Sequence, residues 1–361
     1  MRWHIFCRVI DNYGDAGVCW RLASDLNRRG ERVTLLIDEP KVLTQLAASG
    51  KAQSFLTVLP WPKETESFAP ADTADVIIEA FACDPPSHYV AAMAQRAEMG
   101  NPPVWINLEY LSAEAWVGEH HGLKSPHPRY PLIKHFYFPG FTPDSGGLIR
   151  EVGTVEFFTG PAEQHDESHA EKLPQPIRIF LFCYEQPALQ AWITALDHTI
   201  LSLAPCPARN QLMQGHFETP ATLMIRELPF VPQMDFDALL KDQDFLFVRG
   251  EDSFVRAQWA GIPLVWHIYP QADGVHLVKL RAFYERYLDP DILTPEQRET
   301  FMRFLLAWNG AGNPLVCAEL WPNIVAMLPG LLANALAWRE TLLKQADLVT
   351  QLRAFVGDLI K

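Results

Sequence analysis

Two carboxylates, Asp11 and Asp15, lie four residues apart in the segment DNYGDAG near the start of the chain. The glycines beside them, Gly14 and Gly17, leave room for another molecule to approach the backbone. Such a pair of acids can act as a general base and a group that orients the substrate. Two plainer interpretations remain open, because Asp15 could cap the helix that follows and Asp11 could form a turn. The segment lacks the GxGxxG spacing, and its acids would repel phosphate, so we expect a catalytic or acceptor-binding loop.

A second segment, RGEDSF, combines a cation with the predicted start of a helix. Arg249 and Gly250 follow a strand-like run, and Ser253 lies in the first turn of the expected helix. The free N–H groups and the dipole at a helix start favour an anion, and an arginine adds a cation suited to phosphate. Glu251 and Asp252 are either ordinary acids of a first helical turn or groups that bind the hydroxyls of a sugar.

Aromatic side chains form a third candidate set. Phe182 and Tyr184 follow the strand-like run IFLFCYE, whereas Phe230 and Phe236 lie in the segment LPFVPQMDFDALL. Rings at strand ends commonly pack into the core, which is the plainer interpretation. The functional alternative is that they enclose a flat base and the methyl face of a deoxy-sugar.

Metal-binding signals are weak in this sequence. The strings Asp235-Phe236-Asp237 and Asp242-Gln243-Asp244 match a DxD pattern, but both lie at expected element boundaries, where acids are common. The histidines around residue 120 lack the spacing of zinc ligands. We therefore expect no metal site.

Alternating strand-like and helix-like runs position these segments. The strand-like runs are 2–9, 32–38, 74–81, 103–111, 177–185, 221–228, 244–248 and 262–268, and the helix-like runs include 16–29, 187–198 and 251–261. Gly30 and Gly261 are expected to end their helices, and Thr294 to begin another with a capping box. This alternation predicts an α/β fold with parallel sheets that bind ligands beyond the carboxyl ends of their strands.

The length of 361 residues is enough for two domains, and the polar stretch 159–176 is the best candidate for a linker between them. We predict an N-terminal domain over 1–158, a C-terminal domain over 177–335, and a final helix within 336–361 that packs back on the N-terminal domain. Two doubly wound halves of this kind imply a cleft between them.

The composition excludes some classes of function. The net charge is −13 and no basic patch is evident, so we expect no nucleic-acid partner. No apolar run approaches 18 residues and the start does not read as a signal peptide, so we expect no membrane span and no secretion. The six cysteines have no CxxC spacing, and they read as buried free thiols in a reducing compartment: Cys7, Cys19, Cys83, Cys183, Cys206 and Cys317.

Several segments together resemble the EarP family, the bacterial protein-arginine rhamnosyltransferases that modify translation elongation factor P. They are DNYGDAGVCWRLA, FCYE, RGEDSFVRAQWAGIPLVWHIYPQ, NLEYLSAEAWV and FPGFT, and the resemblance runs through nearly the whole chain. It implies a GT-B fold, in which two Rossmann-like domains face a cleft. It also implies dTDP-β-L-rhamnose as the donor on the C-terminal domain, and an arginine of elongation factor P as the acceptor on the N-terminal domain. The reaction would be inverting, cytoplasmic and independent of metals and other cofactors.

The resemblance also implies roles for individual residues by their motif positions. Asp15 would be the general base, with Asp11 and Glu251 supporting catalysis. The substrate-binding residues would be Tyr13, Gly14, Phe182, Tyr184, Phe230, Gln233, Phe236, Arg249, Gly250, Asp252, Ser253 and Tyr269. Tyr13 stands where phenylalanine also occurs in the family, a change that keeps the ring.

Two alternative functions remain open at this stage. One is a GT-B enzyme that uses another nucleotide sugar and a small acceptor. The other is a two-domain protein that closes on a ligand without chemistry, although the aspartate pair argues against it because a passive binder needs no base.

Overall fold

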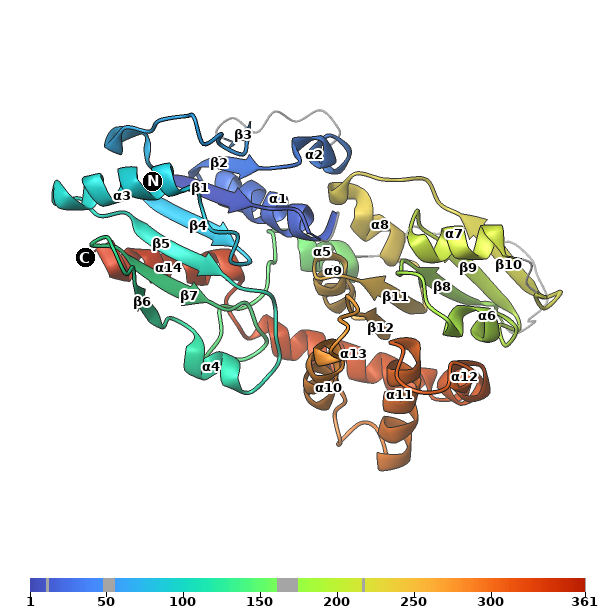
Figure 1. Ribbon diagram of the computed structural model, residues 1–361. Coiled ribbons are helices and arrows are strands. Elements are labelled where there is room, and N and C mark those ends of the chain that lie inside the picture. The colour runs from blue at the N-terminus through green and yellow to red at the C-terminus, as the bar shows by residue number, and fades with distance from the viewer. Residues whose placement is uncertain (11–12, 48–55, 161–174, 216–217, 361) are drawn as a thin grey trace. The chain divides into compact units, whose positions relative to one another are not determined.

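The contacts of the computed structural model divide the chain into two compact units (Figure 1), and the structure describes residues 1–10, 13–47, 56–160, 175–215 and 218–360. The first unit comprises Met1–Glu151 and Gln345–Lys361, and the second comprises Val152–Lys344. The sequence placed the first boundary later, at residue 158. Helix α5 (Thr154–Thr159) instead packs on α9 (Asp252–Ala260) and therefore belongs to the second unit. Most of the expected linker, 159–176, lies outside the described residues.

The first unit is built on a seven-stranded sheet of order β3-β2-β1-β4-β5-β7-β6, in which only β6 runs antiparallel to its neighbour. Its strands are β1 (Arg2–Cys7), β2 (Arg32–Ile37), β3 (Leu56–Pro60), β4 (Val76–Ala80), β5 (Val104–Leu108), β6 (Lys124–Pro126) and β7 (Ile133–Tyr137). Its helices are α1 (Tyr13–Arg28), α2 (Pro40–Leu46), α3 (Ser87–Glu98), α4 (Trp116–His120) and α14 (Leu348–Ile360). The order reverses between β1 and β4, and open α/β sheets bind ligands at the carboxyl ends of strands at such a point.

Helices cover both faces of this sheet (Figure 1). Side chains of α1 and α14 share one buried apolar cluster with the strands, whereas side chains of α3 belong to a cluster on the other face. In α1, Cys19, Leu22 and Leu26 are fully buried and recur at the spacing of one helical face. The helix ends at Gly30, whose φ of +89° confirms the predicted C-cap.

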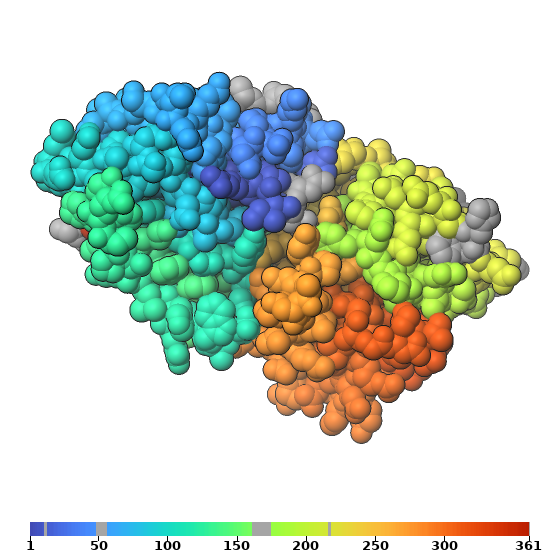
Figure 2. Space-filling model, viewed as in Figure 1, coloured from blue at the N-terminus to red at the C-terminus, as the bar shows by residue number. Residues whose placement is uncertain are grey.

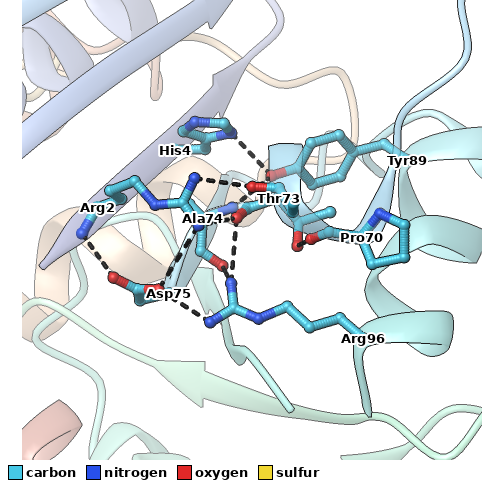
Figure 3. A network of polar contacts seen from close by, with 9 residues as sticks. Arg2, His4, Pro70, Thr73, Ala74, Asp75, Tyr89 and Arg96 are labelled. Carbon is cyan, nitrogen blue, oxygen red and sulfur yellow. Dashed lines mark hydrogen bonds and ion pairs between the residues drawn. The ribbon is translucent and has the colours of Figure 1, made fainter. Parts of the chain in front are cut away.

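A polar network joins the amino ends of β1 and β4 to α3 (Figure 3). The Arg2 guanidinium donates to the carbonyl of Thr73 at 2.9 Å, and its backbone N–H donates to Asp75 at 2.9 Å. Arg96 of α3 donates to the same carboxylate at 2.9 Å. Because this network lies at the end of the strands away from their carboxyl edge, we interpret it as structural.

Asp347 anchors the last helix to the first unit. Its carboxylate accepts from the backbone N–H of Thr350 at 2.9 Å, which caps α14, and from the Arg29 guanidinium at 2.8 Å. Burial alone would raise the pKa of Asp347, but the hydrogen bonds from Thr350 and the charge of Arg29 outweigh it, so the pKa is lowered. The ion pair therefore couples the position of α14 to α1, which carries Asp15.

Replacing Asp347 by asparagine should lower the free energy of unfolding by about 1–2 kcal/mol at pH 7. The amide can still cap the helix, but it no longer forms an ion pair with Arg29. A carboxyl whose folded pKa is lowered contributes fully above its unfolded pKa of about 4 and loses the contribution as the pH falls through the folded value. The difference between wild type and variant should therefore shrink below about pH 4. Urea unfolding at pH 7 and in acid measures the free energy of unfolding. Glu98→Gln, at an exposed position, is the control and should leave the free energy of unfolding unchanged at both pH values. A difference of equal size at both pH values would contradict this role of the charge.

The second unit contains a five-stranded parallel sheet of order β10-β9-β8-β11-β12. Its strands are β8 (Ile177–Leu181), β9 (Thr199–Leu203), β10 (Leu223–Glu227), β11 (Phe245–Arg249) and β12 (Leu264–His267). Besides α5 and α9, its helices are α6 (Ala188–Ile193), α7 (Pro207–Gln214), α8 (Phe236–Leu240), α10 (Val275–Tyr287), α11 (Pro295–Trp308), α12 (Val316–Ala326) and α13 (Leu328–Leu343). Here the order reverses between β8 and β11, so the predicted sites follow the two central strands.

Aromatic side chains fill the core of the second unit. The Trp308 ring lies 4.4 Å from that of Phe247 and 5.2 Å from that of Trp192, measured between centroids. These contacts join α11 and α6 to the sheet, and α12 also packs on α6. In Figure 2 the orange-red atoms of residues near 300–325 accordingly lie against yellow-green atoms near 190.

The predicted helix boundaries at Thr294 and Gly261 are confirmed in this unit, whereas the segment 187–203 differs from the prediction. Thr294 and Gln297 form the expected capping box, with reciprocal hydrogen bonds of 3.3 and 2.9 Å. Gly261 ends α9 with a φ of +66°. The expected helix over 187–198 instead ends at Ile193, and the strand β9 that begins at Thr199 was not predicted. All six cysteines are buried and free, as expected.

Candidate active site

Asp15 lies in the first turn of α1, directly beyond the carboxyl end of β1. The sequence placed the helix start after this residue, so the plain interpretation of Asp15 as an N-cap is wrong. One carboxylate oxygen accepts from the backbone N–H of Ile10 at 2.8 Å, and the other accepts from the Tyr110 hydroxyl at 3.3 Å. The side chain is only 3% exposed. Both oxygens are thus held in place at the point where the strand order reverses.

The other predicted residues of this loop have different positions. Tyr13 begins α1, and its hydroxyl donates to the side chain of Gln45. Gly14 precedes Asp15 in the same turn and is partly exposed. Asp11 lies outside the described residues, so its expected support of catalysis stays a prediction.

Sequence reasoning missed the turn that follows β4, the strand beside β1. Phe81, Ala82 and Asp84 have positive φ values of 57°, 54° and 46°. This conformation is uncommon for residues other than glycine, and it costs about 1–3 kcal/mol for each residue held in it. The Phe81 ring stacks on Tyr110 with centroids 4.2 Å apart. Little in the sequence indicates this turn, because phenylalanine and alanine rarely adopt left-handed backbone, although aspartate does so more often.

In the second unit, Arg249 ends β11 and lies between two predicted aromatic residues. The guanidinium carbon is 4.8 Å from the centroid of the Phe182 ring and 4.8 Å from that of Tyr184. Both rings come directly after β8, the strand that pairs with β11. The arginine is 9% exposed. Stacking on two rings holds a planar cation in place while leaving its edges able to bind an anion.

The helix that follows begins with the predicted acids. Gly250 has a φ of +63°, which turns the chain from β11 into α9. Glu251 forms an ion pair with Lys279 at 3.2 Å, and Asp252 accepts from the Gln233 side chain at 2.8 Å. The Ser253 hydroxyl, as part of the first turn, donates to the carbonyl of Arg249. The structure therefore brings these predicted residues together at one end of β11.

The remaining predicted aromatic residues extend this cluster. Phe236 lies 5.7 Å from Phe182, and Tyr269 lies 5.6 Å from Tyr184, both between ring centroids. Phe230 and Tyr269 are 45% and 47% exposed, so they offer ring surface to a ligand. The plainer interpretation, that the rings of the third candidate set only pack into the core, therefore does not hold for Phe230.

A buried histidine packs against the aromatic cluster. His267 ends β12 and contacts Tyr184 edge to face at 5.2 Å. Burial, with smaller contributions from the charges of Arg249 and His276, lowers the pKa of His267 to about 3. The imidazole is thus neutral near pH 7 and adds no second positive charge next to Arg249.

One acid of each DxD string forms an ion pair. Asp237 pairs with Arg256, and Asp244 pairs with Arg178 at 3.1 Å. Among the residues that the structure describes, no group of three or more histidines, cysteines and acids is arranged to hold a metal ion. Within the same residues, no single helix is long and apolar enough to span a bilayer, although one bent pair, Val316–Ala326 with Leu328–Ile360, meets the criteria of length and composition.

A cavity of about 390 Å³ opens elsewhere in the first unit, beside the start of α3. Trp105, Tyr130 and Lys134 line it, and Lys134 lies 4.6 Å above the Trp105 ring. Beneath them Glu79 is fully buried, and burial raises its pKa despite the ion pair with Lys134. None of the predicted site residues that the structure describes lines this cavity.

Known proteins share both the sequence and the fold of this chain. Residues 3–357 match the family model described as elongation-factor P (EF-P) rhamnosyltransferase EarP. A protein of Pseudomonas aeruginosa named protein-arginine rhamnosyltransferase is 39% identical over 99% of both chains. A solved structure described as the structural basis for EarP-mediated arginine glycosylation of EF-P is 28% identical, covers 99% of both chains and has a TM-score of 0.64.

More distant structures confirm the predicted fold class. The spinosyn rhamnosyltransferase SpnG matches 98% of this chain and 99% of its own, with 13% identity and a TM-score of 0.56. Such similarity concerns the fold alone, and with the two parallel sheets it confirms the GT-B type with two Rossmann-like sheets. The match along almost all of its length shows that this chain belongs to the EarP family.

Proposed function

We propose that this protein transfers L-rhamnose from dTDP-β-L-rhamnose to an arginine side chain of elongation factor P, with inversion at the anomeric carbon. The proposal is supported by the names of its relatives and by residues of suitable chemistry beyond the central strands of each sheet. The observation that carries it is Arg249, stacked between Phe182 and Tyr184 where α9 begins. An acceptor of this kind places the enzyme in the cytoplasm.

The donor would bind to the second unit. A diphosphate meets the Arg249 guanidinium and the N–H groups at the start of α9, where the helix dipole favours negative charge. The base would pack on Phe182 and Phe236, and the sugar hydroxyls would face Asp252 and Glu251. Charge on the leaving diphosphate is then balanced by these groups, so the proposal invokes no divalent ion and no other cofactor.

The acceptor would bind to the first unit. A guanidinium is a poor nucleophile because it is protonated at neutral pH and its lone pairs are delocalised. Asp15, supported by Asp11, would hold it by charge-assisted hydrogen bonds. As the guanidinium nitrogen forms a bond to the anomeric carbon, the bond from that carbon to the phosphate oxygen breaks, dTDP leaves with the electron pair, and Asp15 accepts the proton. Attack opposite the diphosphate inverts the anomeric centre.

The test is to incubate the purified protein with elongation factor P and dTDP-β-L-rhamnose in EDTA, and to map the acceptor by mass spectrometry. We expect one deoxyhexose on one arginine, and none on an acceptor whose arginine is replaced by lysine. Efficient transfer from a different nucleotide sugar, or to a small molecule instead, would assign another glycosyltransferase activity. A donor that stays intact with acceptor present would indicate a protein that only binds it.

A further inference from the structure

The turn after β4 is held by three hydrogen bonds to the two neighbouring strands, β5 and β1. The N–H of Phe81 donates to the carbonyl of Leu108 at 2.7 Å, which ties the turn to β5. The N–H of Ala82 donates to the Asn107 side chain at 3.1 Å. The Cys83 thiol donates to the carbonyl of Phe6 at 3.2 Å, which ties the turn to β1. An unfavourable backbone persists only where its surroundings determine it in this way.

The turn determines where the Phe81 ring lies. Phe81 packs against the apolar cluster of α1 and α14, and its ring stacks on that of Tyr110, nearly parallel at an interplanar angle of 11°. Tyr110 is 37% exposed, and the stack with Phe81 restrains its ring. Its hydroxyl then reaches Asp15 at 3.3 Å from a residue 95 positions away in the chain.

We propose that Tyr110 is a positioning residue for the carboxylate of Asp15, and that the turn over residues 81–84 serves to hold the Tyr110 ring in place. This inference rests on the proposed function of Asp15 as the group that accepts the proton. The Ile10 N–H and the Tyr110 hydroxyl bind different oxygens of the carboxylate, so together they fix its plane. A base that is held in one orientation is more often aligned with the nucleophile, so the reaction is faster.

The hydroxyl also favours the ionised form of the carboxylate, because a donor to a carboxylate stabilises its charge. Another ionisable group that interacts with Asp15 is the thiol of Cys19. A hydrogen bond with Cys7, burial and the nearby charge of Asp15 together raise the pKa of Cys19 well above its usual value. Cys19 therefore stays neutral over the range in which a carboxyl titrates, and a pH profile there reports on the acids.

The decisive variant is Tyr110→Phe, which keeps the stack on Phe81 and removes only the hydroxyl. We expect kcat to fall about tenfold, the size of one hydrogen bond to a charged group, while KM for dTDP-rhamnose is unchanged. The acid limb of the kcat profile should move to higher pH, because the carboxylate has lost a donor. Tyr130→Phe is the matched control, a half-buried tyrosine of the same unit that should change neither quantity.

A second measurement does not depend on the reaction. Melting temperatures are compared for wild type, Tyr110→Phe, Asp15→Ala and the double variant. If the Tyr110 hydroxyl acts through Asp15, Tyr110→Phe should change the melting temperature in the wild-type background. The same substitution should have much less effect when Asp15 is already alanine. Equal shifts in both backgrounds, or an unchanged pH profile of kcat, would overturn the inference. If the wild type transfers no sugar but the two substitutions are coupled, the proposed function fails and the positioning role stands.

Discussion

Replacing Asp15 by asparagine is expected to lower turnover by about 10² or more while donor binding stays close to that of wild type. The amide is nearly the same size and still offers an oxygen to the N–H of Ile10, so the loop should keep its shape. It cannot accept a proton at neutral pH, and the loss of a positioned general base typically has this effect on rate. The measurement combines mass-shift kinetics on elongation factor P with calorimetric titration of dTDP-rhamnose.

Asp38→Asn provides a matched control for this experiment. The carboxylate of Asp38 also accepts a backbone N–H of the loop after β1, that of Val9 at 3.0 Å, but it lies at the end of β2 and is exposed. It should therefore retain nearly full turnover. Near wild-type activity of Asp15→Asn would contradict the assignment of the base. A loss of the same size in both variants would indicate that only the shape of the loop matters.

Replacing Arg249 by methionine is expected to weaken the binding of dTDP about 10²-fold. Methionine retains much of the apolar contact with Phe182 and Tyr184 but removes the cation that would face the diphosphate. Losing one partner of a buried charge contact usually weakens the binding free energy by about 2–5 kcal/mol, and a 10²-fold loss of affinity falls within this range. Lysine at this position should restore only part of the affinity, because an ammonium group neither stacks as a plane nor binds phosphate through two nitrogens.

Arg178→Met is the matched control, since Arg178 lies in β8 of the same unit but pairs with Asp244 at the amino edge of the sheet. Its loss should leave the affinity for dTDP unchanged. Isothermal titration of the three proteins gives the comparison. Wild-type affinity in Arg249→Met would show that the phosphate site lies elsewhere, and equal losses in both variants would indicate a general effect of removing positive charge.

The sequence was sufficient to find residues that directly follow a strand. The carboxyl ends of parallel strands share one edge, so a residue that follows β1, β8 or β11 must lie at the edge where such sheets bind ligands. The rule indicated Phe182 directly after β8, and it also indicated Arg249, the last residue of β11, and Asp15, in the first turn of the helix that follows β1. The sequence also predicted where two helices end, because Gly30 and Gly261 have the backbone freedom that their positive φ values require.

What the sequence did not show are contacts between distant segments and backbone shapes without a residue signature. Tyr110 reaches Asp15 only because β5 and β1 are both neighbours of β4 in the sheet. Phe81 and Ala82 are residue types that rarely adopt positive φ, so a left-handed turn there could not be expected. The strand β9 was missed because its residues, TILSL, directly follow the run 187–198, which was expected to be helical.

The account depends most on where the donor binds, and a crystal structure of the protein with dTDP tests this directly. We expect the diphosphate within about 3 Å of the Arg249 guanidinium and of a backbone N–H at the start of α9, with the base against Phe182 or Phe236. A nucleotide bound away from the end of β11, for example in the cavity beside Trp105, would contradict the proposed donor site and the mechanism built on it.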